Sequence, residues 1–447
     1  MKTMVPKFAL ITAAIIAATY LVSANSEGVA RTSVGTTVNT ATATSDSSTG
    51  ASTLDDIDRL IRDTDAQIAK MPTSSSLDLL AKLLLSRGRI TGDAASYANA
   101  ETAARRSSAI APRNLEAQSI HAEVLYSNHE FREAGELAGK IAASDPTQLG
   151  ALAIRGDSLR ELGDYAGASS IVGQLEKVAP TSPSVLVRRA RLQVLKGDTT
   201  LAADSARRAE KAAQSSGLLG PTISFYSSFR GQIAFDTGDY PGALTHYRDA
   251  LEIAENDRVA TFGMARALVA DGKAAEAKDI LRTLTDRYPD PASLALLEDV
   301  YAATGEQTSA RQTRELLQAI AGIARSNQQI YNRELAMYYA NHDLRLDESL
   351  RLARAEVQNR KDVYAYDTLA WAEYKSGNVT AASSAAKQAL ATGLRDASVL
   401  YHAGLIAIAS GDSPAGVNLL TDALTLNPSF DIKQASLARA ALAKARS

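Results

Sequence analysis

The chain has 447 residues, and its 48 Lys and Arg against 50 Asp and Glu give a formal net charge of −2. This balance provides no broad attraction for nucleic acid, so we expect no nucleic-acid partner. The chain has no cysteine, which excludes a disulfide framework, a thiolate metal site and a cysteine nucleophile.

The N-terminal segment combines positive charge with a short apolar run. Lys2 and Lys7 precede an apolar run that covers residues 8–22, and small residues follow up to Ala24. This order is typical of a secretory signal peptide. The run is shorter than the roughly 20 apolar residues that span a membrane. We therefore expect residues 1–24 to be a signal peptide or, alternatively, an N-terminal membrane anchor, in a protein that is periplasmic or secreted.

Residues 25–53 differ from the rest of the chain in composition. They are dominated by Ser, Thr, Ala and Gly and contain few large apolar side chains. A segment of this kind cannot bury enough apolar surface to form a core, so we expect a disordered linker. It is either a spacer that holds the remaining chain away from a membrane or wall, or a leader without a role.

Helical patterns begin and end the ordered part of the sequence. Asp55, Asp56 and Asp58 open a pattern that runs from Leu54 to about Lys70, and acidic residues favour a helix N-terminus. A second helical pattern covers residues 430–445. We interpret both as capping helices that cover the open ends of a stack of repeats.

Between these caps, marker residues recur at intervals of 34. They are Pro112, Pro146 and Pro180, and the pairs Gly163 and Gly197, Gly238 and Gly272, and Gly377 and Gly411. A period of this size is typical of stacked helix pairs. In such a stack each unit buries its apolar face only on its neighbours. The 34-residue period therefore predicts that the chain forms one long solenoid rather than several globular domains.

The unit from Ala397 to Pro428 shows how the sequence produces the period. An apolar helical pattern stops at Gly411, because glycine accepts the left-handed conformation that ends a helix. Ser413 and Pro414 then start a second helix, which ends before Pro428.

These units resemble the tetratricopeptide repeat. The resemblance rests on Gly163-Asp164-Tyr165 with Ala168, on Gly238-Asp239-Tyr240 with Ala243, and on small residues such as Gly156, Gly231 and Gly404 in the first helices. It covers about ten units between Leu77 and Pro428. It implies an all-α, right-handed superhelical solenoid, in which the first helices line a concave groove that takes a peptide or a partner's helix.

The period is interrupted at two places. Gly197 and Gly238 are 41 residues apart, and the extra length includes residues 217–221, which we expect to form a loop. We therefore divide the solenoid into an N-terminal part, 54–216, and a C-terminal part, 217–447, with one continuous superhelix as the alternative. A longer second helix is predicted from Gln307 to about Arg325.

The sequence contains no recognisable catalytic motif. Its five histidines include no pair at the spacing of a zinc site, and phosphate-binding loops and nucleophile elbows are absent. Asn378-Val379-Thr380 matches a glycosylation sequon, which we attribute to chance. We expect no enzyme activity, no cofactor and no metal.

Aromatic side chains near the C-terminal end are the best candidates for a binding surface. By the phase of the repeats, six of them face the groove: Tyr331, Tyr338, Tyr364, Trp371, Tyr374 and Tyr401. Tyr and Trp offer large contact area at low entropy cost, although packing between units is the alternative. For Phe225, Tyr226, Phe229 and Phe235 we expect packing. Arg160, Arg191 and Arg266 could receive a carboxylate, with a solvated surface as the alternative.

The sequence thus predicts a non-enzymatic scaffold that binds a protein or peptide outside the cytoplasm. Membrane contact is expected only through the N-terminal anchor, if residues 8–22 are retained. The alternatives are a structural subunit of an envelope-assembly, secretion or polysaccharide-export machine, and a self-associating structural chain.

Overall fold

The computed structural model describes residues 54–216, 221–326 and 332–446, which form α-helices and no strand. The helices are α1 (Leu54–Lys70), α2 (Ser74–Thr91), α3 (Ala94–Ile110), α4 (Leu115–Ser127), α5 (Phe131–Ser144), α6 (Leu149–Glu161), α7 (Tyr165–Val178), α8 (Pro183–Leu195), α9 (Thr199–Ser215), α10 (Pro221–Asp236), α11 (Tyr240–Ile253), α12 (Arg258–Ala270), α13 (Ala274–Arg287), α14 (Pro291–Ala303), α15 (Gln307–Ser326), α16 (Asn332–Asn341), α17 (Leu346–Asn359), α18 (Val363–Lys375), α19 (Val379–Ala389), α20 (Ala397–Ala409), α21 (Ser413–Leu426) and α22 (Gln434–Arg446). The predicted signal peptide or anchor and the linker lie outside the described residues.

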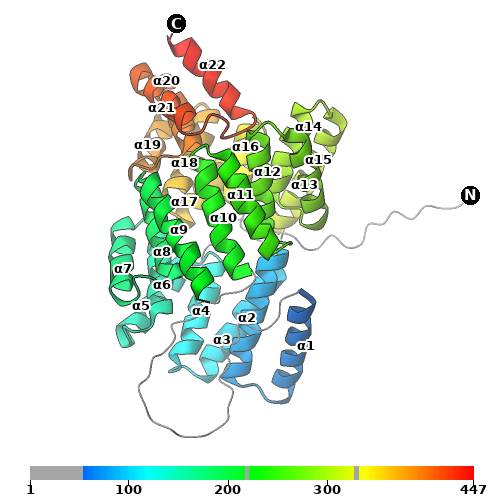
Figure 1. Ribbon diagram of the computed structural model, residues 1–447, viewed down its shortest axis with the longest axis vertical. Coiled ribbons are helices and arrows are strands. Elements are labelled where there is room, and N and C mark those ends of the chain that lie inside the picture. Colours follow the sequence, from blue (N-terminus) through cyan, green and yellow to red (C-terminus); the bar gives the residue numbers. More distant parts are fainter. Residues whose placement is uncertain (1–53, 217–220, 327–331, 447) are drawn as a thin grey trace, which may run out of the picture.

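The helices form antiparallel pairs that stack into a superhelix, which confirms the predicted solenoid (Figure 1). The turn within a pair is tight: at Gly197 the backbone has φ 77°, in the left-handed region. An L side chain adopts this region at a cost of about 1 kcal/mol or more, whereas glycine enters it freely. This explains why glycine marks the period in the sequence.

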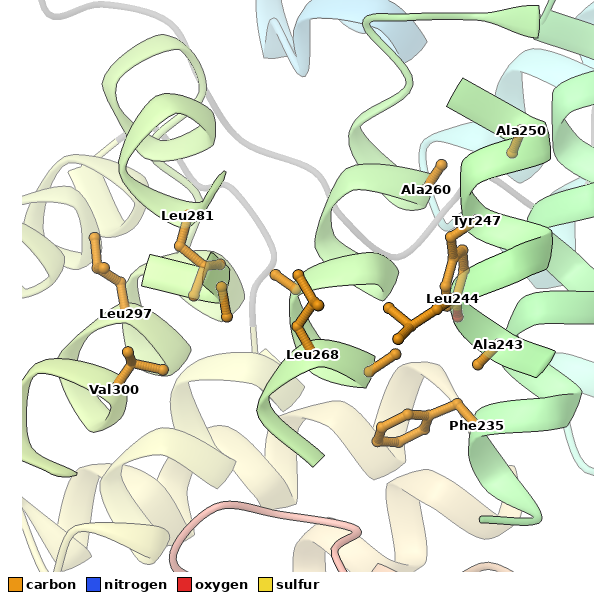
Figure 2. Close-up of a cluster of buried hydrophobic side chains, with 13 residues drawn as sticks. Phe235, Ala243, Leu244, Tyr247, Ala250, Ala260, Leu268, Leu281, Leu297 and Val300 are labelled. Carbon is orange, nitrogen blue, oxygen red and sulfur yellow. The ribbon is translucent and has the colours of Figure 1, made fainter. Parts of the chain in front are cut away.

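The core runs along the stack between adjacent helices. Figure 2 shows one stretch of it, in which Tyr247 of α11 lies among Leu244, Ala260 and other apolar side chains. The Tyr247 ring occupies the space beside Gly231, where an added Cβ would lie 2.8 Å from the ring. The small residues of the first helices are therefore needed because large side chains of the second helices pack directly on their backbones.

The observed bounds of three helices can be compared with those predicted from the sequence. Helix α1 has the predicted bounds and buries Ile57 and Ile68, and α15 is the longer second helix that we expected. Helix α22 begins at Gln434, four residues later than predicted. The Asp431 carboxylate accepts hydrogen bonds from the backbone N–H groups of Lys433 and Gln434, which starts the helix there. In Figure 1, α1 and α22 lie toward opposite ends of the long axis.

The stack continues across the irregular segment at 217–221. Residues 217–220 lie outside the described part of the chain, but the helices on either side share a core. Leu186 of α8, Ala206 of α9 and Phe229 of α10 belong to the same buried cluster.

None of the described helices combines the length and the apolar character of a membrane span.

The superhelix also makes contact with itself. Residues in the turns after α6, α8 and α10 lie against the loops that follow α17, α19 and α21. The hydrogen bonds across this contact join residues between 187 and 200 positions apart, from Tyr240 with Asn427 to the backbone pair of Glu161 and Lys361. One superhelical turn is therefore seated on the next.

Candidate partner-binding surface

The first helices of successive pairs form one layer of the solenoid. Helix α4 packs on α2 and α6, and α18 packs on α16 and α20. We call α4, α6, α8, α10, α12, α14, α16, α18 and α20 the first-helix layer. The five predicted aromatic residues that the structure describes and all three predicted arginines belong to this layer.

Three of the predicted aromatic side chains are brought together. The Trp371 ring lies 5.3 Å from that of Tyr374 and 5.7 Å from that of Tyr401, measured between ring centroids. Trp371 and Tyr401 are only 3% and 1% exposed, and the Trp371 indole donates a hydrogen bond to Asn341 at 2.7 Å. Burial of this kind favours packing between α18 and α20, the alternative that the sequence left open.

The other predicted aromatic residues lie elsewhere. Tyr338 is buried and donates a hydrogen bond to Glu298 at 2.7 Å. Tyr364 is half-buried, and burial followed by the charge of Asp396 raises its pKa. Tyr331 lies outside the described residues. A binding role for these six side chains stays a prediction, and only Tyr364 and Tyr374 of the five described are more than slightly exposed.

The phenylalanines of α10 are buried, which confirms the packing predicted for them. Two of them also support a cation. The Arg191 guanidinium of α8 lies 5.9 Å from the ring centroid of Phe225 and 5.8 Å from that of Phe229. The aromatic faces attract the positive charge but accept no conventional hydrogen bond.

Arg191 is the most unusual charged residue of this layer. It is 7% exposed, and none of its three guanidinium nitrogens has a hydrogen-bond partner among the described residues. Burial, and next the positive charge of Arg160, lower the pKa of Arg191 to about 10. One helical turn earlier, the buried Arg188 donates two hydrogen bonds to Asp157, at 3.0 and 2.6 Å. The same helix thus carries one compensated and one uncompensated buried cation.

The other two predicted arginines do not join Arg191 in a single site. Arg160 pairs with Glu161 at 2.7 Å. Arg266 lies 4.2 Å over the Phe235 ring and donates a hydrogen bond to Gln232 at 3.4 Å. Of the three, Arg191 alone has all its guanidinium nitrogens unpartnered within the described residues.

A charged network that sequence reasoning missed lies beside Arg160. Glu161 accepts a hydrogen bond from the Tyr126 hydroxyl at 3.2 Å and lies 3.7 Å from Arg360. Burial alone would raise the pKa of Glu161, but Arg160, Arg360 and Arg333 together hold it at about 2. Nothing in the repeat pattern signals this network, because Glu161 and Arg360 belong to units far apart in the sequence.

Other sites offer less. A depression of about 490 Å³ lies between α1, α2 and α3, but its central Arg87 is already paired with Asp58 and Asp93. Among the described residues, no group of three or more His, Cys, Asp or Glu side chains could hold a metal ion. His402 is 1% exposed and bound to Asp367 at 3.0 Å, deep in the core.

Comparisons with known proteins identify the repeats. Two family models, both described as tetratricopeptide repeat, match residues 155–217 and 368–429 in one case and 234–300 in the other. No curated protein matches the chain.

Several solved structures are similar in part. A thermophilic TPR protein of Thermus thermophilus is 22% identical, with 44% of this chain and 100% of that chain covered and a TM-score of 0.39. The human IFIT1 dimer with PPP-AAAA is 12% identical, with 83% and 94% covered and a TM-score of 0.45. YrrB, a TPR protein with an unusual peptide-binding site, is 16% identical, with 41% and 91% covered and a TM-score of 0.31. At these TM-scores the similarity says nothing about partners.

Proposed function

Because the chain carries tetratricopeptide repeats, which act as protein-interaction scaffolds, we propose that it binds a protein or peptide partner on its first-helix layer. The family is a non-catalytic scaffold, and the proposed mechanism breaks no covalent bond. The partner is held by shape and by side-chain complementarity. The observation that carries the proposal is the uncompensated guanidinium of Arg191.

The energetics of Arg191 favour an anionic group in the partner. A buried charge without a hydrogen-bond partner costs several kcal/mol, because it has lost its hydration, and the attraction of two aromatic rings offsets only part of that cost. A carboxylate from an acidic side chain or a chain terminus would supply charge and hydrogen-bond acceptors in the geometry that arginine prefers. Phe225 and Phe229 provide an apolar wall beside that position. We therefore propose an acidic residue in the bound segment.

Affinity capture tests this proposal. The full-length chain, the Arg191→Met variant and the matched Arg207→Met variant, whose side chain is 57% exposed, are compared as baits for an envelope extract of the host. We expect the wild type and Arg207→Met to retain the same few proteins. Arg191→Met should retain at least tenfold less of each. Equal retention by all three baits would remove Arg191 from the proposed site.

We also propose that this binding takes place outside the cytoplasm. The support is the order of charge, apolar run and small residues over positions 1–24. Cell fractionation followed by N-terminal sequencing of the isolated protein checks it. A new N-terminus after Ala24 in the exported fraction supports cleavage, Met1 in the membrane fraction supports an anchor, and a purely cytoplasmic protein contradicts both.

A further inference from the structure

The contact between the two superhelical turns has a defined composition. On one side are the turns within the pairs α6–α7, α8–α9 and α10–α11. On the other side are the loops after α17, α19 and α21. We call this contact the seam; its backbone contacts lie at Gly163 with Lys361, Gly197 with Gly393, and Gly238 with Leu426.

The seam glycines allow two backbones to approach closely. A Cβ added to Gly197 would lie 2.5 Å from the carbonyl oxygen of Gly393, and one added to Gly238 would lie 2.9 Å from that of Leu426. At Gly411, in an equivalent turn, an added Cβ would meet nothing within 4 Å. Any side chain at the seam positions would therefore push the two turns apart, whereas at Gly411 it would strain only the local backbone.

Two tyrosines bind the facing loops. The Tyr165 hydroxyl accepts a hydrogen bond from the backbone N–H of Val363 at 2.8 Å. The Tyr240 hydroxyl accepts one from the N–H of Ser429 at 2.9 Å and donates one to the side-chain oxygen of Asn427 at 2.6 Å. The N–H of Ser429 is shared, because it also donates to the Asn427 side-chain oxygen at 3.2 Å. When the turns separate, water can replace every one of the tyrosine hydrogen bonds.

Charged groups also face each other across the seam. Glu161 lies within 3.7 Å of Arg360. Arg333, on the far side, holds Asp362 through hydrogen bonds at 2.9 and 3.0 Å. Ionised groups recover much of their solvation free energy on exposure to water, so separating such a contact costs less than separating an apolar one of equal area.

Apolar packing supplies the remaining cohesion. A small buried cluster combines residues of both turns: Ala168, Val172, Leu192 and Leu195 from one, and Val363, Ala389, Leu394 and Val399 from the other. Each turn, however, has larger cores of its own, such as the cluster around Phe229 and the cluster around Trp371. In a solenoid each unit needs only its neighbours for stability. Both turns would therefore stay folded if the seam were lost.

We propose that the seam is a latch at which the two superhelical turns separate and rejoin while every helix pair stays folded. In the closed state the first-helix layer at α6 and α8 lies within a self-contacting spiral. Opening gives a partner access to that layer from the side. This last consequence rests on the proposed function, whereas the latch itself does not.

Spin-label distances test the latch without any partner. Because the chain has no cysteine, Thr200→Cys and Ala391→Cys, both at exposed positions on opposite sides of the seam, give one defined label pair. We expect a major short distance and a minor longer one in the parent chain. The longer population should grow at least threefold in Gly197→Ala and Gly238→Ala and stay unchanged in Gly411→Ala, with the same helical circular dichroism throughout.

Identical distances in all four proteins would show a permanent contact and overturn the latch. If a glycine variant lost its helical signal, Tyr240→Phe would replace it, because it removes hydrogen bonds without adding bulk. An unchanged distance distribution in that variant would count equally against the proposal. Since no partner takes part, a failure here is distinct from a failure of Arg191 to capture one.

Discussion

Two sets of turns in this solenoid share one sequence motif and differ in their surroundings. Gly163, Gly197 and Gly238 end first helices that lie at the seam, whereas Gly272, Gly377 and Gly411 end first helices with nothing near the glycine. All six have φ between 77° and 94°. The local reason for glycine is therefore common to all, and only three positions have a second, long-range reason. The same repeat residue can thus carry two separable roles.

The largest difference between the two sets should come from replacing the glycine itself. Gly377→Ala forces a side chain into the left-handed region and should lower the free energy of unfolding by about 1–2 kcal/mol. Gly163→Ala adds an overlap with the Lys361 backbone, so we expect a total loss of about 3 kcal/mol or more. Urea denaturation of both variants measures this. Equal losses would mean that the seam adds nothing to stability.

Removing a seam charge should have the next largest effect. Glu161→Gln removes the carboxylate that pairs with Arg160 and one of the two that lie near Arg360, the other being Glu356. We expect a loss of about 2–3 kcal/mol at pH 7. The exposed Glu276 is the control, and Glu276→Gln should change stability by less than about 0.5 kcal/mol. Because the folded pKa of Glu161 is about 2, its contribution is present above about pH 4.5 and is lost as the pH falls toward 2. A wild type with no acid sensitivity in this range would argue against the network.

A pair of carboxylates makes one part of the seam sensitive near neutral pH. Burial, and next the charge of Asp396 from the other side of the seam, raise the pKa of Asp236 to about 7; Arg266 opposes this, and Tyr247 and Tyr364 also face the carboxyl. An aspartate with a raised folded pKa contributes fully below its unfolded pKa of about 4, and this contribution is lost as the pH rises through 7.

We therefore expect the wild type to lose on the order of 2–3 kcal/mol between pH 5 and pH 8 through this group. Asp236→Asn should abolish that part of the pH dependence, as followed by denaturant unfolding at both pH values. An Asn variant that keeps the full slope would assign it to another group.

The smallest effect should come from a single hydroxyl. Tyr240→Phe removes the hydrogen bonds to Asn427 and Ser429 and should cost about 1 kcal/mol. Tyr288 is a control, because it is buried, whereas Tyr240 is half-buried, and its hydroxyl has no hydrogen-bond partner among the described residues. Tyr288→Phe should be nearly neutral. Thermal unfolding measures the stability of both variants. A Tyr240→Phe variant as stable as Tyr288→Phe would show that water replaces the Tyr240 hydrogen bonds at no cost.

Much of the fold could be predicted because it is local. The Gly and Pro positions fix the helix ends, and the apolar spacing fixes the buried faces, so α1 and the long α15 have nearly the expected bounds. The burial of the aromatic side chains was harder to predict. Repeat phase assigns Trp371 and Tyr401 to first helices, but it does not show that neighbouring side chains cover them there.

The seam could not be predicted from any local pattern. Its register depends on the sum of small rotations between successive units, and an error of a few degrees in each would place Gly197 against a different loop. In the sequence, Tyr165 and Tyr240 belong to the repeat's turn motif, and their bonds to Val363 and Ser429 appear only in three dimensions.

Self-contact also changes how the chain should fold. An open solenoid behaves as a one-dimensional array, in which ends fray and units melt almost independently. Here hydrogen bonds join residues as much as 200 positions apart, so closing the spiral carries a loop-closure entropy that grows with the logarithm of that separation. The units can assemble first by local propagation, and the long-range contacts form last. Once formed, they couple the melting of helices α6–α11 to that of helices α17–α21, and a linear repeat array gains the cooperativity of a globular domain.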